Sequence, residues 1–176
     1  MKKYLLLQKK YRPMKDVKKE TMVIISLIVL AVASRLLPHP PNFAPITGIA
    51  LFAVTKFKSK WIAFIFPLLC LFFTDLILGL SWINLFVYFS FVLISSLGLY
   101  SKKIKLHTVF FSSIIFFVVS NFGVWLLYYP HTLEGLLACF TLAIPFYVNT
   151  LAGDLVYTGV IFYAFSMIKN TYFKIA

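Results

Sequence analysis

Apolar residues occur in long runs along the chain, and short segments that carry lysine or proline separate one run from the next. A run of roughly 17–25 apolar residues is long enough for a helix that crosses a bilayer. The pattern predicts an all-α integral membrane protein, with a basic cytoplasmic tail over residues 1–20 and a single six-helix transmembrane domain over residues 21–176. The predicted spans are residues 21–37, 45–55, 61–80, 83–100, 106–129 and 146–168, of which the second is short.

Prolines mark the expected breaks between and within these helices. Four of the eight prolines fall within residues 35–47, where they exclude a regular helix and favour extended backbone, so we expect a stiff connector there. Pro67 predicts a kink in the third span. Further along, Thr132 is a candidate cap for a short helix over residues 133–144. Pro145 is then expected to kink or restart the chain before the last span.

The overall composition agrees with a membrane protein. Hydrophobic residues make up 61% of the 176 residues, and the mean hydropathy is +0.92, which is more apolar surface than a soluble domain of this length needs. The net charge of +12 does not indicate nucleic acid, because the lysines lie in short segments between apolar runs. Cys70 and Cys139 lie in apolar surroundings without metal-ligand spacing, so we interpret them as lipid-facing or packed thiols.

Basic residues alternate between the two sides of the predicted bundle. The N-terminal tail carries eight Lys and Arg residues, and the segments at residues 56–60, 102–105 and 169–174 carry three, three and two. Lys and Arg concentrate on the cytoplasmic side of a membrane. This asymmetry predicts that both termini are cytoplasmic and that the protein is a multi-pass protein of the bacterial inner (plasma) membrane.

Two alternatives concern the N-terminus. Ala31-Val32-Ala33 resembles a signal-peptidase site after a short apolar core, so cleavage within the first span is one alternative. The polar connector that follows fits a membrane hairpin better than a secreted domain. Met14 is an alternative start of the chain, because little before it is patterned as structure.

A few polar side chains fall inside the predicted spans. From the rise per residue of a helix, Arg35, Asp75, Asn121 and Asn149 are expected in the outer half of the membrane, and Asp154 nearer its middle. Ionisable groups at such depths are costly and face a partner or a cavity. With one arginine and two aspartates, we expect Arg35 to pair with Asp75 or Asp154. The alternative is a polar network that only pins the helices together.

The functional interpretation of these residues is a ligand pocket that opens to the outside. Asn121 and Trp125 share one face of the fifth span, and Asn149 and Tyr157 share one face of the sixth. Amide, indole and phenol groups near a charged set suit a small polar ligand with a ring, whereas the alternative is an interfacial aromatic belt. The predicted ligand-binding residues are Arg35, His39, Asn42, Asp75, Asn121, Trp125, Asn149, Asp154 and Tyr157.

The sequence lacks the motifs of common enzyme classes. It contains no phosphate-cradling glycine loop, no H-E-x-x-H, no G-x-S-x-G and no His/Cys cluster of the metal-binding type. The three histidines are dispersed along the chain. We therefore expect no catalytic residues, no metal and no cofactor, and keep a membrane enzyme as a second alternative.

Several short segments resemble the substrate-binding S components of energy-coupling-factor transporters. They are Arg35-Leu36-Leu37-Pro38 at the end of the first span, Pro45-Ile46-Thr47-Gly48 at the start of the second, and Thr74-Asp75-Leu76 in the third. The closer resemblance is to an uncharacterised bacterial six-span group of that type and covers nearly the whole chain from residue 22. That group shares residues 35–46, Ser-Asn-Phe-Gly-Val-Trp over residues 120–125, and Asn-Thr-Leu-Ala-Gly-Asp over residues 149–154.

The resemblance implies binding of a vitamin, nucleobase or related micronutrient from outside, with a separate energising membrane subunit and two ATPases as partners. S components typically dock that subunit through an Ala-x-x-x-Ala pattern on the first span, and this spacing is missing among Ala31, Ala33 and Ser34. The expected function is therefore a substrate-binding membrane subunit for solute uptake. The alternative from a different class is a non-transporting membrane scaffold or assembly protein.

The topology is testable by cysteine labelling of intact cells. In a variant without Cys70 and Cys139, Lys103→Cys should stay unlabelled by a membrane-impermeant maleimide, because the turn that carries it is expected in the cytoplasm. His131→Cys, in the connector expected outside, is the matched control and should react. Labelling at position 103 in unbroken cells contradicts the topology.

Overall fold

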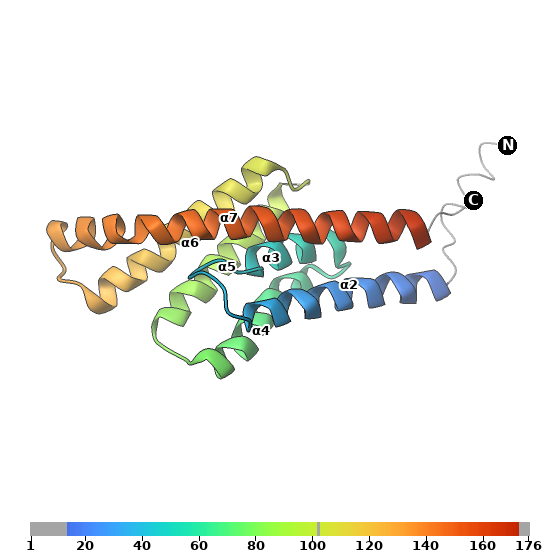
Figure 1. Ribbon diagram of the computed structural model, residues 1–176, viewed down its shortest axis with the longest axis horizontal. Helices are drawn as coiled ribbons and strands as arrows, with labels where there is room; N and C mark the ends of the chain where they lie inside the picture. The colour runs from blue at the N-terminus through green and yellow to red at the C-terminus, as the bar shows by residue number, and fades with distance from the viewer. Residues whose placement is uncertain (1–13, 102, 173–176) are drawn as a thin grey trace.

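The computed structural model describes residues 14–101 and 103–172, and these form helices and connecting turns without strands (Figure 1). The helices are α2 (Met14–Arg35), α3 (Ile46–Lys56), α4 (Lys60–Leu78), α5 (Ile83–Tyr100), α6 (Leu106–Tyr128) and α7 (Leu133–Tyr172). The predicted all-α class is confirmed for this part of the chain. Four of the helices, α4 to α7, are long and apolar enough to cross a membrane.

Two helix ends bear on the sequence predictions. α2 begins at Met14 rather than at residue 21, so residues 14–20 of the predicted tail are helical. The segment contains neither Gly nor Pro, and its lysines and glutamate are good helix formers. Residues 1–13 of that tail lie outside the described residues. The predicted cap before α7 is confirmed, because Thr132 Oγ1 accepts a hydrogen bond from the Gly135 N–H at 3.1 Å.

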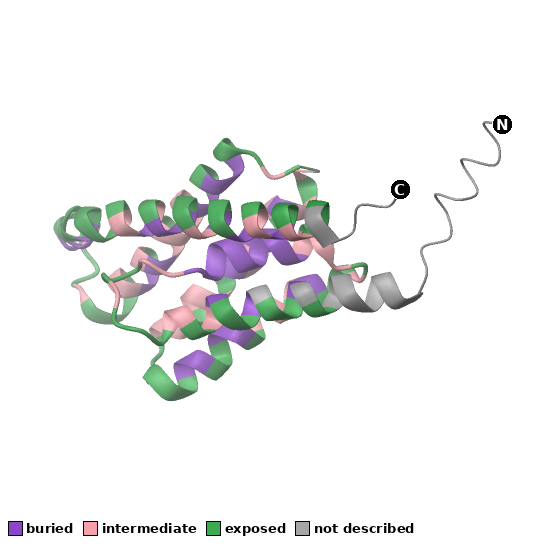
Figure 2. Ribbon diagram, turned by 45° about the vertical axis from the view of Figure 1, so that its right-hand side comes forward, coloured by how far each residue is buried: buried purple, intermediate pink, exposed green. Residues whose placement is uncertain are grey.

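The short helix α3 lies at the core of the fold. Every residue from Ile46 to Ala53 is buried, and Figure 2 shows α3 as a continuous buried segment with the other helices around it. It packs mainly against α4, α5 and α7. Its 11 residues rise only about 16 Å, roughly half the thickness of the hydrocarbon layer. A helix this short and this apolar is accommodated by burial inside the protein.

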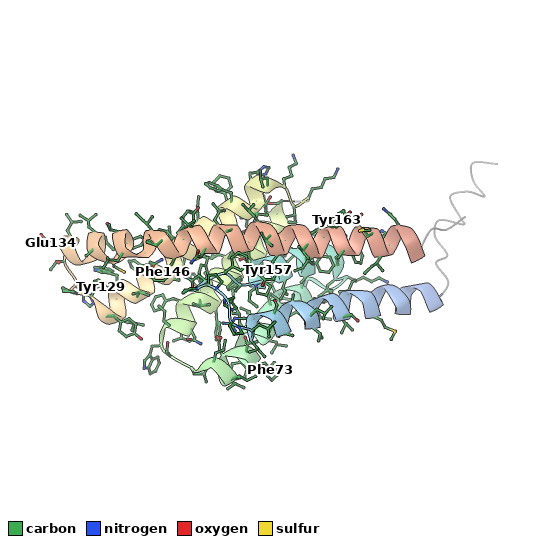
Figure 3. All side chains as sticks on the ribbon, viewed as in Figure 1. Phe73, Tyr129, Glu134, Phe146, Tyr157 and Tyr163 are labelled. Carbon is green, nitrogen blue, oxygen red and sulfur yellow. The ribbon has the colours of Figure 1, made fainter. Side chains whose placement is uncertain are left out.

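Large apolar side chains point outward from the long helices (Figure 3). Phe73 of α4 is 60% exposed, and Phe146 and Tyr163 of α7 are 45% and 67% exposed. A soluble protein rarely exposes apolar surface on this scale. Lipid chains solvate such side chains at little cost, so these surfaces are consistent with a multi-pass membrane protein.

The last helix corrects the prediction that a new helix starts after Pro145. α7 is one helix of 40 residues, and the short helix predicted over residues 133–144 is its first part. A proline inside a helix removes one hydrogen bond and costs roughly 3 kcal/mol. Helix α6 packs against α7 on both sides of Pro145 and offsets part of this cost. The Phe117 ring of α6 lies 5.7 Å from the Phe140 ring and 4.9 Å from the Tyr147 ring, measured between centroids. One contact falls on each side of the proline, which supports the helix on both sides of it.

Two glycines let neighbouring segments approach the backbone of α7. A Cβ atom on Gly48 of α3 would lie 3.0 Å from the backbone nitrogen of Thr158. A Cβ atom on Gly153 of α7 would lie 3.0 Å from the Cα atom of Phe43. Phe43 belongs to the connector, residues 36–45 between α2 and α3, which is non-helical as predicted. The connector and α3 are thus held against the same helix.

The close approach of α3 to α7 gives a stability prediction. Gly48→Ala should lower the melting temperature of the purified protein in detergent, because the added methyl group meets backbone atoms and overpacking costs about 1–3 kcal/mol. Gly159→Ala is the matched control on α7, where nothing lies within 4 Å of the new atom. That change should hold or raise stability, by about 0.5–1 kcal/mol. Equal melting temperatures for the two variants contradict the close packing.

Candidate functional site

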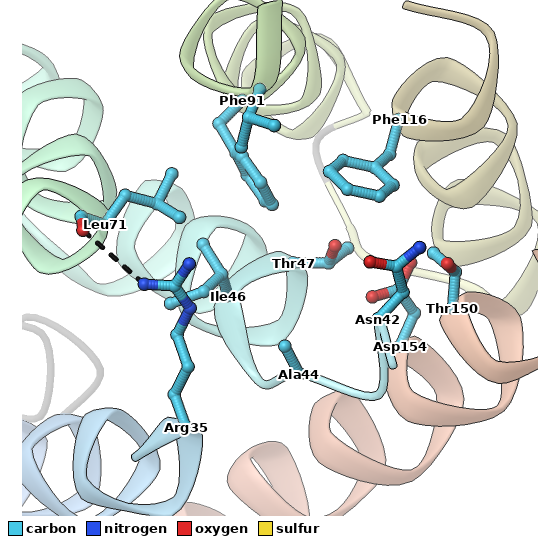
Figure 4. Close-up of a pocket in the computed structure, with 11 residues that line it drawn as sticks. Arg35, Asn42, Ala44, Ile46, Thr47, Leu71, Phe91, Phe116, Thr150 and Asp154 are labelled. Atoms are coloured by element: carbon cyan, nitrogen blue, oxygen red, sulfur yellow. Dashed lines mark hydrogen bonds between the residues drawn. The ribbon is translucent and has the colours of Figure 1, made fainter. Parts of the chain in front are cut away.

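A polar cavity of about 140 Å³ lies beside the first turn of α3 (Figure 4). Each of the described helices and the connector contributes to its wall. The lining residues are Arg35, Asn42, Ala44, Ile46, Thr47, Leu71, Val87, Phe91, Phe116, Thr150 and Asp154. Charged, hydroxyl and amide groups therefore share one partly open space with aliphatic and aromatic side chains.

Arg35, the last residue of α2, lies on one side of the cavity and pairs with Asp75 of α4. Its Nη2 atom lies 2.6 Å from Asp75 Oδ1, and its Nη1 atom donates to Thr74 Oγ1 and to the Leu71 carbonyl oxygen. Figure 4 marks the contact with Leu71. The prediction that Arg35 pairs with Asp75 or Asp154 is confirmed, and the partner is Asp75.

Asp75 has hydrogen-bond donors on both carboxylate oxygens. Besides Arg35 on Oδ1, the Oδ2 atom accepts from Asn84 Nδ2 at 2.8 Å and from Tyr88 Oη at 2.9 Å. The residue as a whole is 3% exposed. A buried carboxylate with a bonded guanidinium and two further donors is compensated for its loss of hydration. It links α2, α4 and α5 at one point.

Asp154 of α7 lies on another side of the cavity in a different environment. It is also 3% exposed, and its Oδ2 atom accepts a hydrogen bond from Ser113 Oγ of α6 at 2.6 Å. The hydroxyl-bearing residues Thr47 and Thr150 lie beside it in Figure 4. Among residues 14–101 and 103–172, it has no ion pair with Lys, Arg or His. The cavity therefore contains a buried carboxyl group whose surroundings supply hydroxyl groups and no cation.

Two phenylalanine rings form the wall opposite these polar groups. The rings of Phe91 on α5 and Phe116 on α6 lie 5.8 Å apart between centroids. Both point toward the space between Arg35 and Asp154 in Figure 4. The negative face of an aromatic ring attracts cations and also packs well against apolar groups.

Three of the nine predicted ligand-binding residues line the cavity, and two more contact Arg35, which is one of the three. Arg35, Asn42 and Asp154 line it, and Asp75 lies behind Arg35 as its ion-pair partner. His39 is in the connector, with Nε2 3.0 Å from the Arg35 carbonyl oxygen. The structure thus brings together the residues from the end of α2, the connector, α4 and α7.

The other four predicted residues lie outside the cavity lining. Asn121 donates to a carbonyl oxygen of its own helix at 2.7 Å, and Trp125 Nε1 donates to the Pro130 carbonyl oxygen at 3.0 Å. The Tyr157 ring packs on an aromatic ring of the connector, 5.5 Å away between centroids. Asn149 is half-buried. In this arrangement, Asn121 and Trp125 are each satisfied by a nearby backbone carbonyl.

Sequence reasoning missed the hydroxyl and aromatic members of the site. Thr150, one residue from the predicted Asn149, lines the cavity, as do Thr47, Phe91 and Phe116. A signal for Thr150 was present, because Thr150 and Asp154 are separated by four residues and so share one helical face. The two phenylalanines carried no signal, since they are two among 20 in an apolar chain.

Comparison with known protein families gives a match over most of the chain. A family model described as "Family of unknown function (DUF6580)" matches residues 15–175. No curated protein matches the chain, and no solved structure matches it.

The ion pair is testable by a double-mutant cycle. Arg35→Leu and Asp75→Asn should each lower stability in detergent, because removing one partner of a buried pair leaves the other uncompensated and costs about 3–5 kcal/mol. The combined variant should lose less than the sum of the two single losses, because neither charge is left unpaired. Thermal unfolding of all four proteins measures the difference. Strictly additive losses contradict the pairing.

Proposed function

The chain belongs to DUF6580, a family of unknown function. We propose that the protein binds a small solute from outside the cell, as the substrate-binding membrane subunit of an uptake system. One observation carries the proposal. A cavity lined by charged and hydroxyl side chains lies inside a bundle whose helices are otherwise apolar. Ionisable groups inside a membrane mark substrate or ion pathways by default.

The volume of the cavity indicates the size of solute that fits inside it. At about 140 Å³ it is close to the engineered cavity of about 150 Å³ that holds a benzene molecule in another protein. A single-ring compound or an aliphatic compound of similar size matches this volume. Multi-ring vitamins need the larger pockets, of about 300–1,000 Å³, that hold drug-sized ligands. Among the solutes that the sequence suggests, nucleobase-sized and smaller compounds are favoured.

The proposed entry side follows from the distribution of basic residues. In the proposed topology all six helices belong to the membrane domain, with both termini and the lysine-bearing turns in the cytoplasm. The connector then faces outside, and its residues Asn42 and Ala44 line the cavity. This arrangement supports access to the cavity from outside the cell.

The resemblance to S components suggests a separate membrane subunit with ATPases, whereas the first helix lacks the usual docking pattern. A scaffold could use the Arg35–Asp75 pair equally well, because a fully bonded pair holds helices together without a ligand. The cavity beside that pair is what favours uptake over a scaffold.

Solute binding is testable with cavity-filling variants. At least one compound from a panel of nucleobases, vitamins and their precursors, or a compound that co-purifies in native mass spectrometry, should raise the melting temperature of the wild type. Thr150→Leu should weaken that binding at least tenfold, because its larger apolar side chain occupies the cavity and removes a hydroxyl group. Val148 of the same helix is 60% exposed. Val148→Leu is therefore the matched control and should bind the compound normally.

A second variant fills the same cavity from a different segment, so that a loss of binding shared by both variants points to the cavity and not to a folding defect of one of them. Ala44→Leu enters the cavity from the connector rather than from α7 and should reduce binding in the same way. Wild-type affinity in both filling variants excludes this cavity as the binding site. If no compound stabilises or co-purifies with the wild type, the uptake proposal fails and the scaffold alternative replaces it.

A further inference from the structure

The formal charges at the cavity do not balance. Arg35 contributes one positive charge, and Asp75 and Asp154 contribute one negative charge each when ionised. Arg35 is already engaged by Asp75 at 2.6 Å, so this pair is neutral as a unit. One carboxylate, that of Asp154, is left without a cation among the residues that the structure describes.

Hydroxyl groups alone do not compensate a buried carboxylate for lost hydration. Ser113 donates to one oxygen of Asp154, and the other nearby polar groups are the uncharged side chains of Thr47, Thr150 and Asn42. A carboxylate that is 3% exposed in apolar surroundings must either take up a proton or accept a cation. The adjacent cavity has room for a molecule that carries that cation.

The remaining walls of the cavity suit an organic cation rather than a bare ion. Phe91 and Phe116 present aromatic rings to the cavity, and an ammonium group near a ring face gains about 0.5–2 kcal/mol. Ile46, Leu71 and Val87 provide aliphatic surface for a hydrocarbon body. The described residues contain no cluster of three or more His, Cys, Asp or Glu side chains that could hold a metal ion.

We propose that the solute is a small organic monocation, with its ammonium group held between the Asp154 carboxylate and the rings of Phe91 and Phe116. The inference rests on the proposed solute-binding function and narrows it to one charge class. Arg35 stays paired with Asp75 and contacts the far end of the ligand. The hydroxyl groups of Thr47 and Thr150 orient the Asp154 carboxylate and form hydrogen bonds with polar groups of the ligand.

Matched compounds that differ only in charge test the proposal. Binding to the full-length protein in detergent is measured by calorimetry and by thermal shift. Choline is compared with its uncharged isostere 3,3-dimethylbutan-1-ol, and butylammonium with butan-1-ol and butyrate. At least one cation should bind at least tenfold more tightly than its uncharged partner, because only the cation neutralises Asp154.

Asp154→Asn separates the charge of this residue from its shape. The variant should lose at least tenfold in affinity for the cation and keep its affinity for the uncharged partner. Its melting temperature without ligand should equal or exceed that of the wild type, because asparagine can still bond to Ser113 and cannot become an uncompensated buried charge. Tyr163→Phe, on the exposed face of α7, is the matched control and should leave both affinities unchanged.

The outcomes distinguish failure of this inference from failure of the proposed function. If uncharged or anionic compounds bind as tightly as cations, and the filling variant Thr150→Leu abolishes that binding, solute binding stands and the cationic class is wrong. Tighter binding of the zwitterion glycine betaine than of choline would assign a carboxylate to Arg35 and overturn the monocation. Cation binding that survives Asp154→Asn overturns the role of Asp154. If no compound binds the wild type and none co-purifies, both proposals fail.

Discussion

The ion pair between Arg35 and Asp75 constrains one end of the bundle. An unpaired charge in an apolar interior costs several kcal/mol. Moving the end of α2 away from α4 would leave both charges unpaired and would therefore be unfavourable. The same carboxylate binds Asn84 and Tyr88 of α5, which joins three helices at one group. Because the connector starts directly after Arg35, the pair also fixes where the chain enters the cavity wall.

The buried helix α3 forms the side of the cavity that faces Asp154. Gly48 allows α3 to approach the backbone of α7 at Thr158, one turn beyond Asp154. Gly153 allows the connector to approach α7 beside Asp154 itself. These two contacts bring Thr47, the connector and Asp154 to the same level of the bundle. The cavity is therefore a consequence of close backbone packing around α7, together with side chains that do not fill the space left between α3, α5 and α6.

The sequence predicted the helices better than it predicted the site. Hydropathy located α5 at its observed bounds, and counting charges predicted that Arg35 would pair with an aspartate. The continuity of α7 through Pro145 was not predictable, because it depends on ring contacts with α6. The lining of the cavity depends on the rotation of each helix about its axis. One residue is a rotation of about 100°, which is why Thr150 lines the cavity and its neighbour Asn149 does not.

The two aspartates, Asp75 and Asp154, are equally buried, yet their surroundings assign them different roles. Asp75 has a guanidinium, an amide and a phenol as donors, so it is compensated in the protein as it stands and needs no ligand. Asp154 has only hydroxyl donors and an open cavity beside it, so its ionised form is stable only when a further positive group arrives. A structural role alone would be served as well by an uncharged asparagine at position 154, which could still hydrogen-bond to Ser113. A carboxyl group at that position is therefore explained by binding of a positively charged ligand in the cavity.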